Sequence, residues 1–186
     1  MKRSLQVLLA MAALVCASAL ADDYDDTATL FKNAGQSAGF FKNSYGYALF
    51  PSIGKGGLGV GAAHGKGRVY QQGKYVGDTS MTQVSIGFQA GGQAYSQIIF
   101  MEDKRAFDEF TSGNFGFDAS VGAVAITASA SASASTQGGG TSTSAGKNDA
   151  TTAGKYHKGM AVFTIVKGGA MYEASVAGQK FSYKAN

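Results

Sequence analysis

Alternation of apolar and polar side chains marks much of this chain as β-strand. It is clearest in residues 81–89, where Val84, Ile86 and Phe88 fall on one parity and mainly polar or small residues on the other. Because alternate side chains of a strand point to opposite faces, this segment is predicted to be a half-buried antiparallel strand. A strand-like pattern is also expected in the glycine-rich stretch 45–70, and strands are expected in residues 68–71, 74–77, 95–101, 115–125, 161–167, 171–176 and 180–183.

Two other segments have helical spacing. The N-terminal segment 22–43 has an apolar stripe at spacings of one, three or four residues, formed by Leu30, Phe31, Ala34, Ala38 and Phe41. Gly35 and Gly39 each weaken this helix by about 1 kcal/mol relative to alanine, so the helix must be stabilised by packing against a sheet or a membrane. Residues 102–111 also have helical spacing, and Gly113 follows them.

These elements together predict the fold class. Glycine-containing pairs at short intervals, such as Gln72-Gly73 and Gly91-Gly92, are expected to be turns between consecutive strands. Only one intervening segment is long and helical enough for a parallel crossover. We therefore expect an α+β protein with a curled antiparallel or barrel-like sheet of about eight strands, an N-terminal amphipathic helix and one short helix.

Residues 1–21 have the pattern of a secretory signal peptide. Lys2 and Arg3 precede an apolar stretch, and small residues up to Ala21 suit cleavage. We therefore expect a periplasmic or secreted protein that begins at Asp22. A lipoprotein acylated at Cys16 is the less favoured alternative, because a bulky valine precedes the cysteine where a small residue is wanted.

Composition excludes several kinds of function. Cleavage would remove the only cysteine and lower the net charge from +4 to +2, which is too weak a field to predict a nucleic-acid partner. The two histidines lie far apart in sequence without carboxylates at ligand spacing, so neither a metal site nor a cofactor is expected. Residues 136–155 are almost entirely small or polar and are predicted to form a mobile low-complexity loop.

Two enzyme-like patterns fail in their context. Gly54 to Gly59 spells a dinucleotide fingerprint, but the run continues into a strand-like, glycine-rich segment where a helix would be required. Gly35 to Gly39 spells the serine-hydrolase elbow, but Ser37 is predicted to lie within a helix and not after a strand. No enzymatic activity is therefore predicted.

Basic residues occur within the glycine-rich stretch and shortly after it. Lys55, His64, Lys66 and Arg68 lie within it, with Lys74 beyond, and seven glycines occur from Gly54 to Gly67. One interpretation is an ordinary solvated surface. The other is an anion site, in which glycine amides and these cations receive a lipid head group.

Longer motifs in the same region resemble the SYLF-domain family. The resemblance rests on Tyr47-Ala-Leu-Phe-Pro-Ser-Ile53, on Lys55-Gly-Gly-Leu-Gly-Val-Gly61 and on Gly65-Lys-Gly67. It continues through Ile98-Ile-Phe-Met101 and the closing segments around Gly168 and Gly178, and so covers roughly residues 38–186.

The resemblance implies a lipid-binding module. The place of the family's membrane helix is then occupied by Leu30, Phe31, Ala34 and Phe41, with Lys32 and Lys42 at its basic positions, and the residues expected to contact acyl chains are Leu30, Phe31, Phe40 and Phe41. The phenylalanines Phe40 and Phe41 equally suit an internal staple between helix and sheet. The aspartates between residues 22 and 26 depart from a helix that meets an anionic surface.

The expected function is therefore non-enzymatic binding of anionic lipids or phospholipids at the cell envelope, with head-group contacts from Lys55, His64, Lys66 and Arg68. Some relatives in this family bind actin, but a secreted protein would not meet it, so an actin partner is not expected. Two alternatives stay open. One is an envelope protein-interaction or structural protein that uses the 136–155 loop for docking, and the other is a small outer-membrane barrel.

Overall fold

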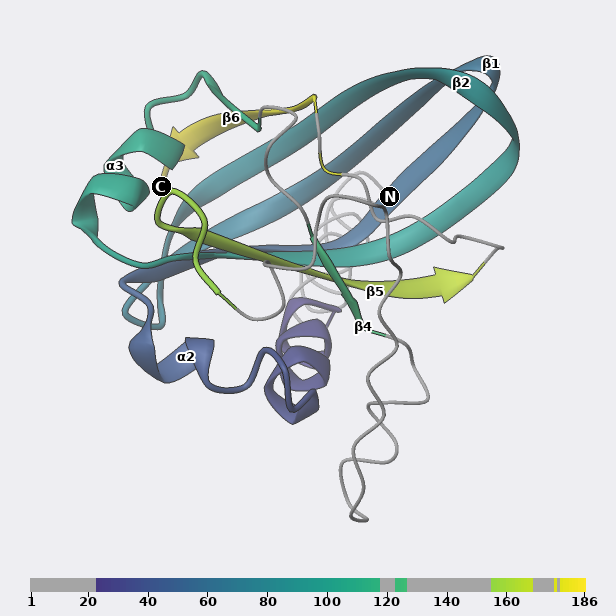
Figure 1. Ribbon diagram of the computed structural model, residues 1–186. Helices are drawn as coiled ribbons and strands as arrows, with labels where there is room; N and C mark the ends of the chain where they lie inside the picture. The colour runs from purple at the N-terminus through teal and green to yellow at the C-terminus, as the bar shows by residue number, and fades with distance from the viewer. Residues whose placement is uncertain (1–22, 118–122, 127–154, 169–175, 177) are drawn as a thin grey trace, which may run out of the picture.

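Two strands of unusual length form the centre of the fold. β1 (Gly46–Gln71) and β2 (Lys74–Met101) pair antiparallel along their length as one continuous ribbon (Figure 1). The turn between them consists of Gln72 and Gly73, whose φ angles are 49° and 79°. Positive φ at both positions is typical of the two-residue hairpin turn whose twist matches that of the flanking strands. The turn predicted at these two residues is confirmed.

The computed structural model describes residues 23–117, 123–126, 155–168, 176 and 178–186. Besides the ribbon it contains a helix at residues 23–33, α2 (Phe40–Asn43), α3 (Lys104–Phe110), β3 (Phe115–Gly116), β4 (Val124–Ile126), β5 (Met160–Gly168) and β6 (Gln179–Ala185). The predicted leader with Cys16, the 136–155 loop apart from its last residue, and nearly all of the strand predicted at 171–176 lie outside the described residues.

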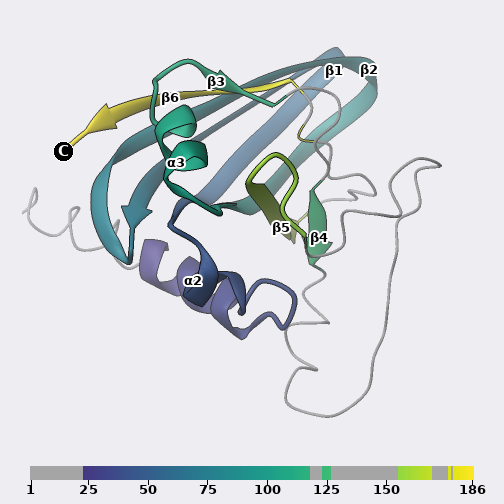
Figure 2. The same ribbon diagram turned by 60° about the vertical axis from the view of Figure 1, so that its left-hand side comes forward.

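β2 is the central strand of the sheet. β1 follows one of its edges throughout, while the other edge pairs first with β6 and then with β5. β3 and β4 add short outer strands beside β6 and β5, and the β4–β5 pair is parallel whereas the other pairs are antiparallel. Two views agree that the sheet curls around itself (Figure 1, Figure 2). The predicted class, α+β with a curled antiparallel sheet, is confirmed.

The ribbon curls until its two ends meet. The backbone N–H of Gln72 donates to the carbonyl oxygen of Tyr45 at 3.2 Å, and the side-chain amide of Gln71 donates to the Tyr45 hydroxyl at 2.7 Å. The rings of Tyr47 and Tyr70 stack with their centroids 4.8 Å apart. The hairpin turn therefore lies next to the start of the same ribbon.

The turn predicted at Gly91-Gly92 is wrong. Both residues lie inside β2 and pair with Gly57 and Gly56 of β1. The pairing of the two strands changes register close by. Two positions along β1, from Leu58 to Val60, are matched by four positions along β2, from Ala90 to Ile86. Such bulges bend a strand and increase its twist without ending it. The glycines therefore accompany a bend in a continuous ribbon and not the end of a strand.

The sheet has two hydrophobic cores, one on each face. The inner core lies within the curl, and its largest fully buried members include Phe50, Ile53, Met81, Ile99, Met101 and Phe110. The outer core lies between the other face of the sheet and the N-terminal helix, with Phe31, Leu49, Ile98, Phe100 and Phe163 fully buried. The apolar end of β2 is thus covered on both faces, as its continuous hydrophobic run predicts.

The N-terminal helix is shorter than its apolar stripe predicts. It ends at residue 33, a turn spans residues 34–39, and α2 is a separate piece. The buried hydroxyl of Ser37 donates to the carbonyl oxygen of Phe31 at 2.6 Å, which satisfies a backbone group at the helix end. A serine side chain competes in this way with helical hydrogen bonds of the backbone. The neighbouring glycines Gly35 and Gly39 also have low helix propensity.

A polar cluster interrupts the inner core. The side-chain amides of Gln97 and Gln179 exchange two hydrogen bonds, of 2.9 and 3.1 Å. The Gln179 amide also donates to the Tyr95 hydroxyl at 3.3 Å, and Tyr95 is only 2% exposed. Burial raises the pKa of the Tyr95 hydroxyl to about 12, an effect that the hydrogen bond from Gln179 opposes.

This raised pKa predicts a loss of stability in alkali. Above pH 10 an unfolded chain ionises Tyr95 whereas the folded chain keeps it protonated, so the free energy of unfolding falls as the pH rises from 10 to 12. Tyr95 alone contributes about 1.4 kcal/mol per pH unit over this range. Urea unfolding between pH 9 and 12 measures the slope, which should be shallower in Tyr95→Phe. An unchanged slope in this variant would contradict the assignment.

Candidate functional site

One outer face of the curled sheet is basic. It is formed by the second half of β1, the first half of β2 and β6, and we call it the basic face. Odd-numbered residues of β1 from Gly61 to Val69 are buried, so the even-numbered ones point outward. The same holds along β6, where Lys180 and Lys184 are exposed and Phe181 is buried. The basic residues of this face are His64, Lys66, Arg68, Lys180 and Lys184.

Strand register arranges these cations in cross-strand rows. Lys66 faces Ser80 and then Ser182, and His64 faces Thr82 and then Lys180. In the third row, Arg68 and Lys184 flank Asp78. Cross-strand neighbours lie about 5 Å apart, so Asp78 partly offsets the charge of its own row. The positive charge is therefore least compensated around Lys66 and Lys180.

Arg68 is held by aromatic rings at one end of the basic face. Its guanidinium carbon lies 4.3 Å from the ring centroid of Tyr24, in the N-terminal helix, and 5.3 Å from that of Tyr75. Contacts of this kind contribute roughly 0.5–2 kcal/mol. Burial raises the pKa of Tyr24, an effect that the positive charge of Arg68 opposes. Arg68 thus helps to dock the N-terminal helix and is only partly available to a head group.

Lys55 does not belong to the basic face. The register of β1 is regular from Ile53 to Lys55, whose partners on β2 are Tyr95 and Gln93. Ile53 and Tyr95 both belong to the inner core, so Lys55 is directed toward the inside of the curl and is half-buried. The prediction of one cationic rim that joins Lys55 with His64, Lys66 and Arg68 is therefore wrong. Its reason is parity: Lys55 is odd-numbered, as are the buried Ile53 and Ala63, whereas His64, Lys66 and Arg68 are even-numbered and so lie on the other face of the strand.

The glycines of β1 serve packing and do not form an anion cradle. A Cβ atom on Gly65 would lie 2.5 Å from the Ile53 side chain, and one on Gly67 would lie 2.6 Å from the Phe50 ring and 2.8 Å from the Leu49 carbonyl oxygen. The side of the second half of β1 that carries Gly65 and Gly67 thus packs directly against the first half of the same strand. The predicted cradle of free glycine amides is corrected, because this stretch is an extended strand paired with β2.

Most of the predicted acyl-chain residues face the sheet in this structure. Phe31 is fully buried, and Phe40 packs against Phe100 and Phe163 with centroids 5.4 and 5.1 Å apart. Phe41 packs against the same Phe100 ring at 4.9 Å. Leu30 is 43% exposed and so is available to a lipid. Acyl contact by the three phenylalanines would require the helical segment to leave the sheet and stays a prediction.

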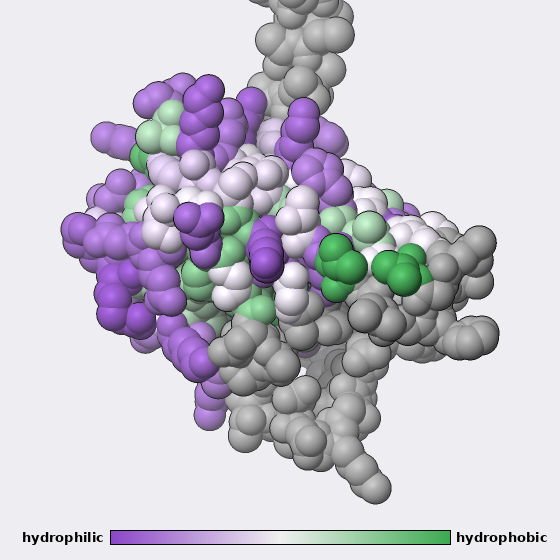
Figure 3. Space-filling model, turned by 90° about the horizontal axis from the view of Figure 1, so that it is seen from above, coloured by the Kyte–Doolittle hydropathy of each residue, from purple (hydrophilic) through white to green (hydrophobic). Residues whose placement is uncertain are grey.

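Sequence reasoning missed an exposed apolar patch next to the basic face. Val60 is 60% exposed and Val84 70% exposed, and both lie on the same outer face as His64 and Lys66. We call these two residues the valine tip. From above, strongly apolar side chains stand in the open beside paler and purple ones (Figure 3). The alternation at residues 81–89 did contain the signal, but a period of two does not tell which face is buried.

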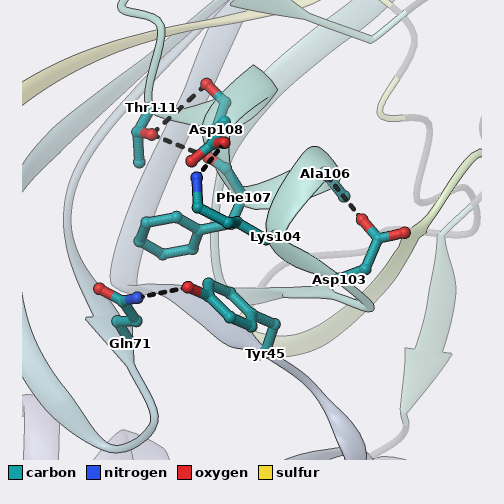
Figure 4. Close-up of polar contacts among 8 residues, drawn as sticks. All are labelled: Tyr45, Gln71, Asp103, Lys104, Ala106, Phe107, Asp108 and Thr111. Carbon is teal, nitrogen blue, oxygen red and sulfur yellow. Dashed lines mark hydrogen bonds and ion pairs between the residues drawn. The ribbon is translucent and has the colours of Figure 1, made fainter.

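Other candidate sites have ordinary structural roles. α3 packs one face, with Phe110, into the inner core, and its polar contacts are structural: Asp103 accepts a hydrogen bond from the Ala106 amide at 2.8 Å and Lys104 pairs with Asp108 (Figure 4). A hollow of about 100 Å³ near Phe115 and His157 is far smaller than the roughly 300 Å³ of typical ligand sites. Among the described residues, no three potential metal ligands gather and no helix is long and apolar enough to cross a bilayer.

Comparison with known proteins identifies the family. The family described as "Ysc84: Las17-binding protein actin regulator" matches residues 82–186, from within the first half of β2 to the end of the chain. "Beta cell expansion factor A" of Aeromonas veronii is 31% identical over 156 residues, which cover 82% of this chain and 51% of that protein. The chain thus spans about half the length of this relative. It belongs to the Ysc84 family, which is the SYLF-domain family.

Proposed function

We propose that this protein binds anionic phospholipids at the cell envelope, without catalysis, through the basic face. The observation that supports this is the gathering of His64, Lys66, Lys180 and Lys184 on one outward surface, with Asp78 as the acidic residue among them. Lipid binding is also what the family resemblance implies. The proposal also rests on the expected leader, which would direct the protein to the periplasm or outside the cell, where phospholipid head groups are accessible.

Electrostatic attraction between the basic face and an anionic membrane is too small to give tight binding by itself. A lysine or arginine near an anionic membrane contributes about 1 kcal/mol. Even if Lys66, Lys180, Lys184 and the partly engaged Arg68 all met the membrane, they would supply at most about 3–4 kcal/mol, which corresponds to a dissociation constant of about 1 mM or weaker. Binding by the basic face should therefore be weak, sensitive to salt and in need of an apolar contribution.

The experiment that tests this proposal is sedimentation with vesicles of phosphatidylethanolamine and phosphatidylglycerol. Lys66→Glu combined with Lys180→Glu should lower the bound fraction more than tenfold, since two attractive charges become repulsive. Lys42→Glu is the matched control, because Lys42 is exposed at the end of α2, on the opposite side of the molecule from β6 (Figure 2). This variant should bind nearly as well as the unmodified protein.

The same set of variants identifies where the proposal fails. Equal binding by the double variant and the unmodified protein would exclude the basic face. Loss of binding in Lys42→Glu alone would move the site to the helical side, as the family resemblance implies for the N-terminal helix. Lys55→Glu tests the residue that the structure separates from the basic face, and it should have little effect.

A further inference from the structure

The valine tip lies at the bend of the ribbon. The bend is where β1 and β2 change register, between Leu58 and Val60 on β1, on the far side of the curl from the hairpin turn (Figure 1). Val60 pairs with Ile86, and Val84 pairs with Ala62, so the two valines occupy neighbouring rows of the same face. Both are more than half exposed, whereas most large apolar side chains of the described residues are covered.

Position along the strands ranks the cations by their distance from the valine tip. At about 3.3 Å per residue, the row of Thr82 and Lys180 lies about 7 Å from Val84 along β2. The row of Lys66 lies about 13 Å from Val84, and the row of Arg68 and Lys184 about 20 Å. From the bend towards the hairpin turn, the face therefore changes from apolar to basic and then to charge-compensated.

This order matches the layers of a bilayer. The polar head-group layer of each leaflet is roughly 5–8 Å thick around an apolar interior, and peripheral elements bury apolar groups about 5–10 Å deep at the boundary. With Val60 and Val84 at that depth, Lys180 reaches the phosphates directly and the long side chain of Lys66 reaches them from the next row. Lys184 and Arg68 stay in the aqueous phase.

We propose that the bend of the ribbon is the part that enters the membrane. The valine tip then lies in the upper acyl region, and Lys180 and Lys66 contact the phosphates. This inference rests on the proposed function and adds an orientation to it. It assigns the apolar contribution to the tip and leaves the Arg68 end free to hold the N-terminal helix. A second copy of this chain or a protein surface would instead cover the valines without lipid.

The chain contains no tryptophan, so an introduced one is a unique probe. Val84→Trp and Val60→Trp should shift their fluorescence to shorter wavelength on binding vesicles of phosphatidylethanolamine and phosphatidylglycerol. Lipids brominated near the head-group end of their acyl chains should quench both. Tyr75→Trp is the control, because Tyr75 is exposed and lies nine residues from Val84 along β2, about 30 Å away along the strand. Its tryptophan should stay unquenched.

A second pair of variants tests the orientation without a new aromatic residue. Lys180→Ala and Lys184→Ala remove the same charge from the same face of β6. Bend-first docking predicts that Lys180→Ala weakens binding about fivefold and that Lys184→Ala changes it less than twofold. Val60→Ser with Val84→Ser should weaken binding at least tenfold.

The outcomes separate this inference from the proposed function. Sedimentation with vesicles but no quenching at either valine would overturn the bend-first orientation and leave lipid binding in place. Equal quenching at positions 75 and 84 would show flat docking and would overturn it too. A wavelength shift that depends on protein concentration and not on lipid would assign the valine tip to a second copy. Absence of sedimentation with any vesicle would overturn the proposed function itself.

Discussion

Gly57→Ala should destabilise the protein by about 3 kcal/mol or more. Gly57 has a φ of 155°, and a Cβ atom there would lie 2.7 Å from the Cα atom of Gly61 and closer still to the Val60 carbonyl oxygen. These are backbone atoms of the same bend, so no side-chain rotation relieves the contact. Urea unfolding followed by circular dichroism measures the loss.

Gly54→Ala is the matched control for this prediction. Gly54 lies three residues earlier in the same strand and is exposed, and a Cβ atom there would meet nothing within 4 Å beyond its chain neighbours. Alanine at this position should be neutral or should stabilise by about 0.5 kcal/mol, since it restricts the unfolded chain more than glycine does. Equal stability of the two variants would show that the bend does not depend on close backbone contact.

Phe31→Ala should cost about 3 kcal/mol, which is the second large effect. Its ring is fully buried in the outer core between the N-terminal helix and the sheet. Truncation leaves a cavity and removes the main anchor of the helix. Hydrogen exchange should then show faster exchange in residues 23–33, and the urea midpoint should fall.

Leu30→Ala separates structural anchoring from lipid contact, because Leu30 is adjacent in sequence but 43% exposed. Its stability should stay within about 0.5 kcal/mol of the unmodified protein. If Leu30 meets acyl chains, as the family resemblance implies, the same variant should sediment less with vesicles. Unchanged stability in Phe31→Ala, together with weaker vesicle binding, would instead assign Phe31 to the membrane.

Local rules predicted those elements whose signals are local. The Gln72-Gly73 turn follows from the chemistry of two-residue hairpins, and it occurs as predicted. The helix predicted at residues 102–111 appears as α3, which Asp103 caps through its side chain. The continuous apolar run that ends at Met101 is covered on both faces.

The length of the ribbon was not predictable from the same rules. A glycine pair such as Gly91-Gly92 fits both a turn and a bend within a strand, and the choice depends on β1, which lies far away in sequence. The close approach of Gly67 to Phe50 likewise depends on the curl, which no short window contains. Glycine richness therefore predicted close backbone contact but not its partner.

The candidate site was predicted in part for the same reason. Period-two spacing correctly places His64, Lys66 and Arg68 on one face of one strand. The same spacing places the odd-numbered Lys55 on the opposite face, so the prediction of a single cationic rim failed because it grouped the cations by closeness in sequence and not by parity. Lys180 and Lys184 join the face only through pairing with β2, and no local pattern connects them with β1.

The meeting of the ribbon's two ends has a consequence for the order of assembly. A hairpin that zips from Gln72-Gly73 forms its nearest pairs early, because little chain entropy opposes them. The pairing of Gly46 with Met101 encloses the most chain, and the contact of Tyr45 with Gln72 needs the completed curl. The tyrosine stack of residues 47 and 70 should therefore be among the last contacts to form during refolding and among the first to open.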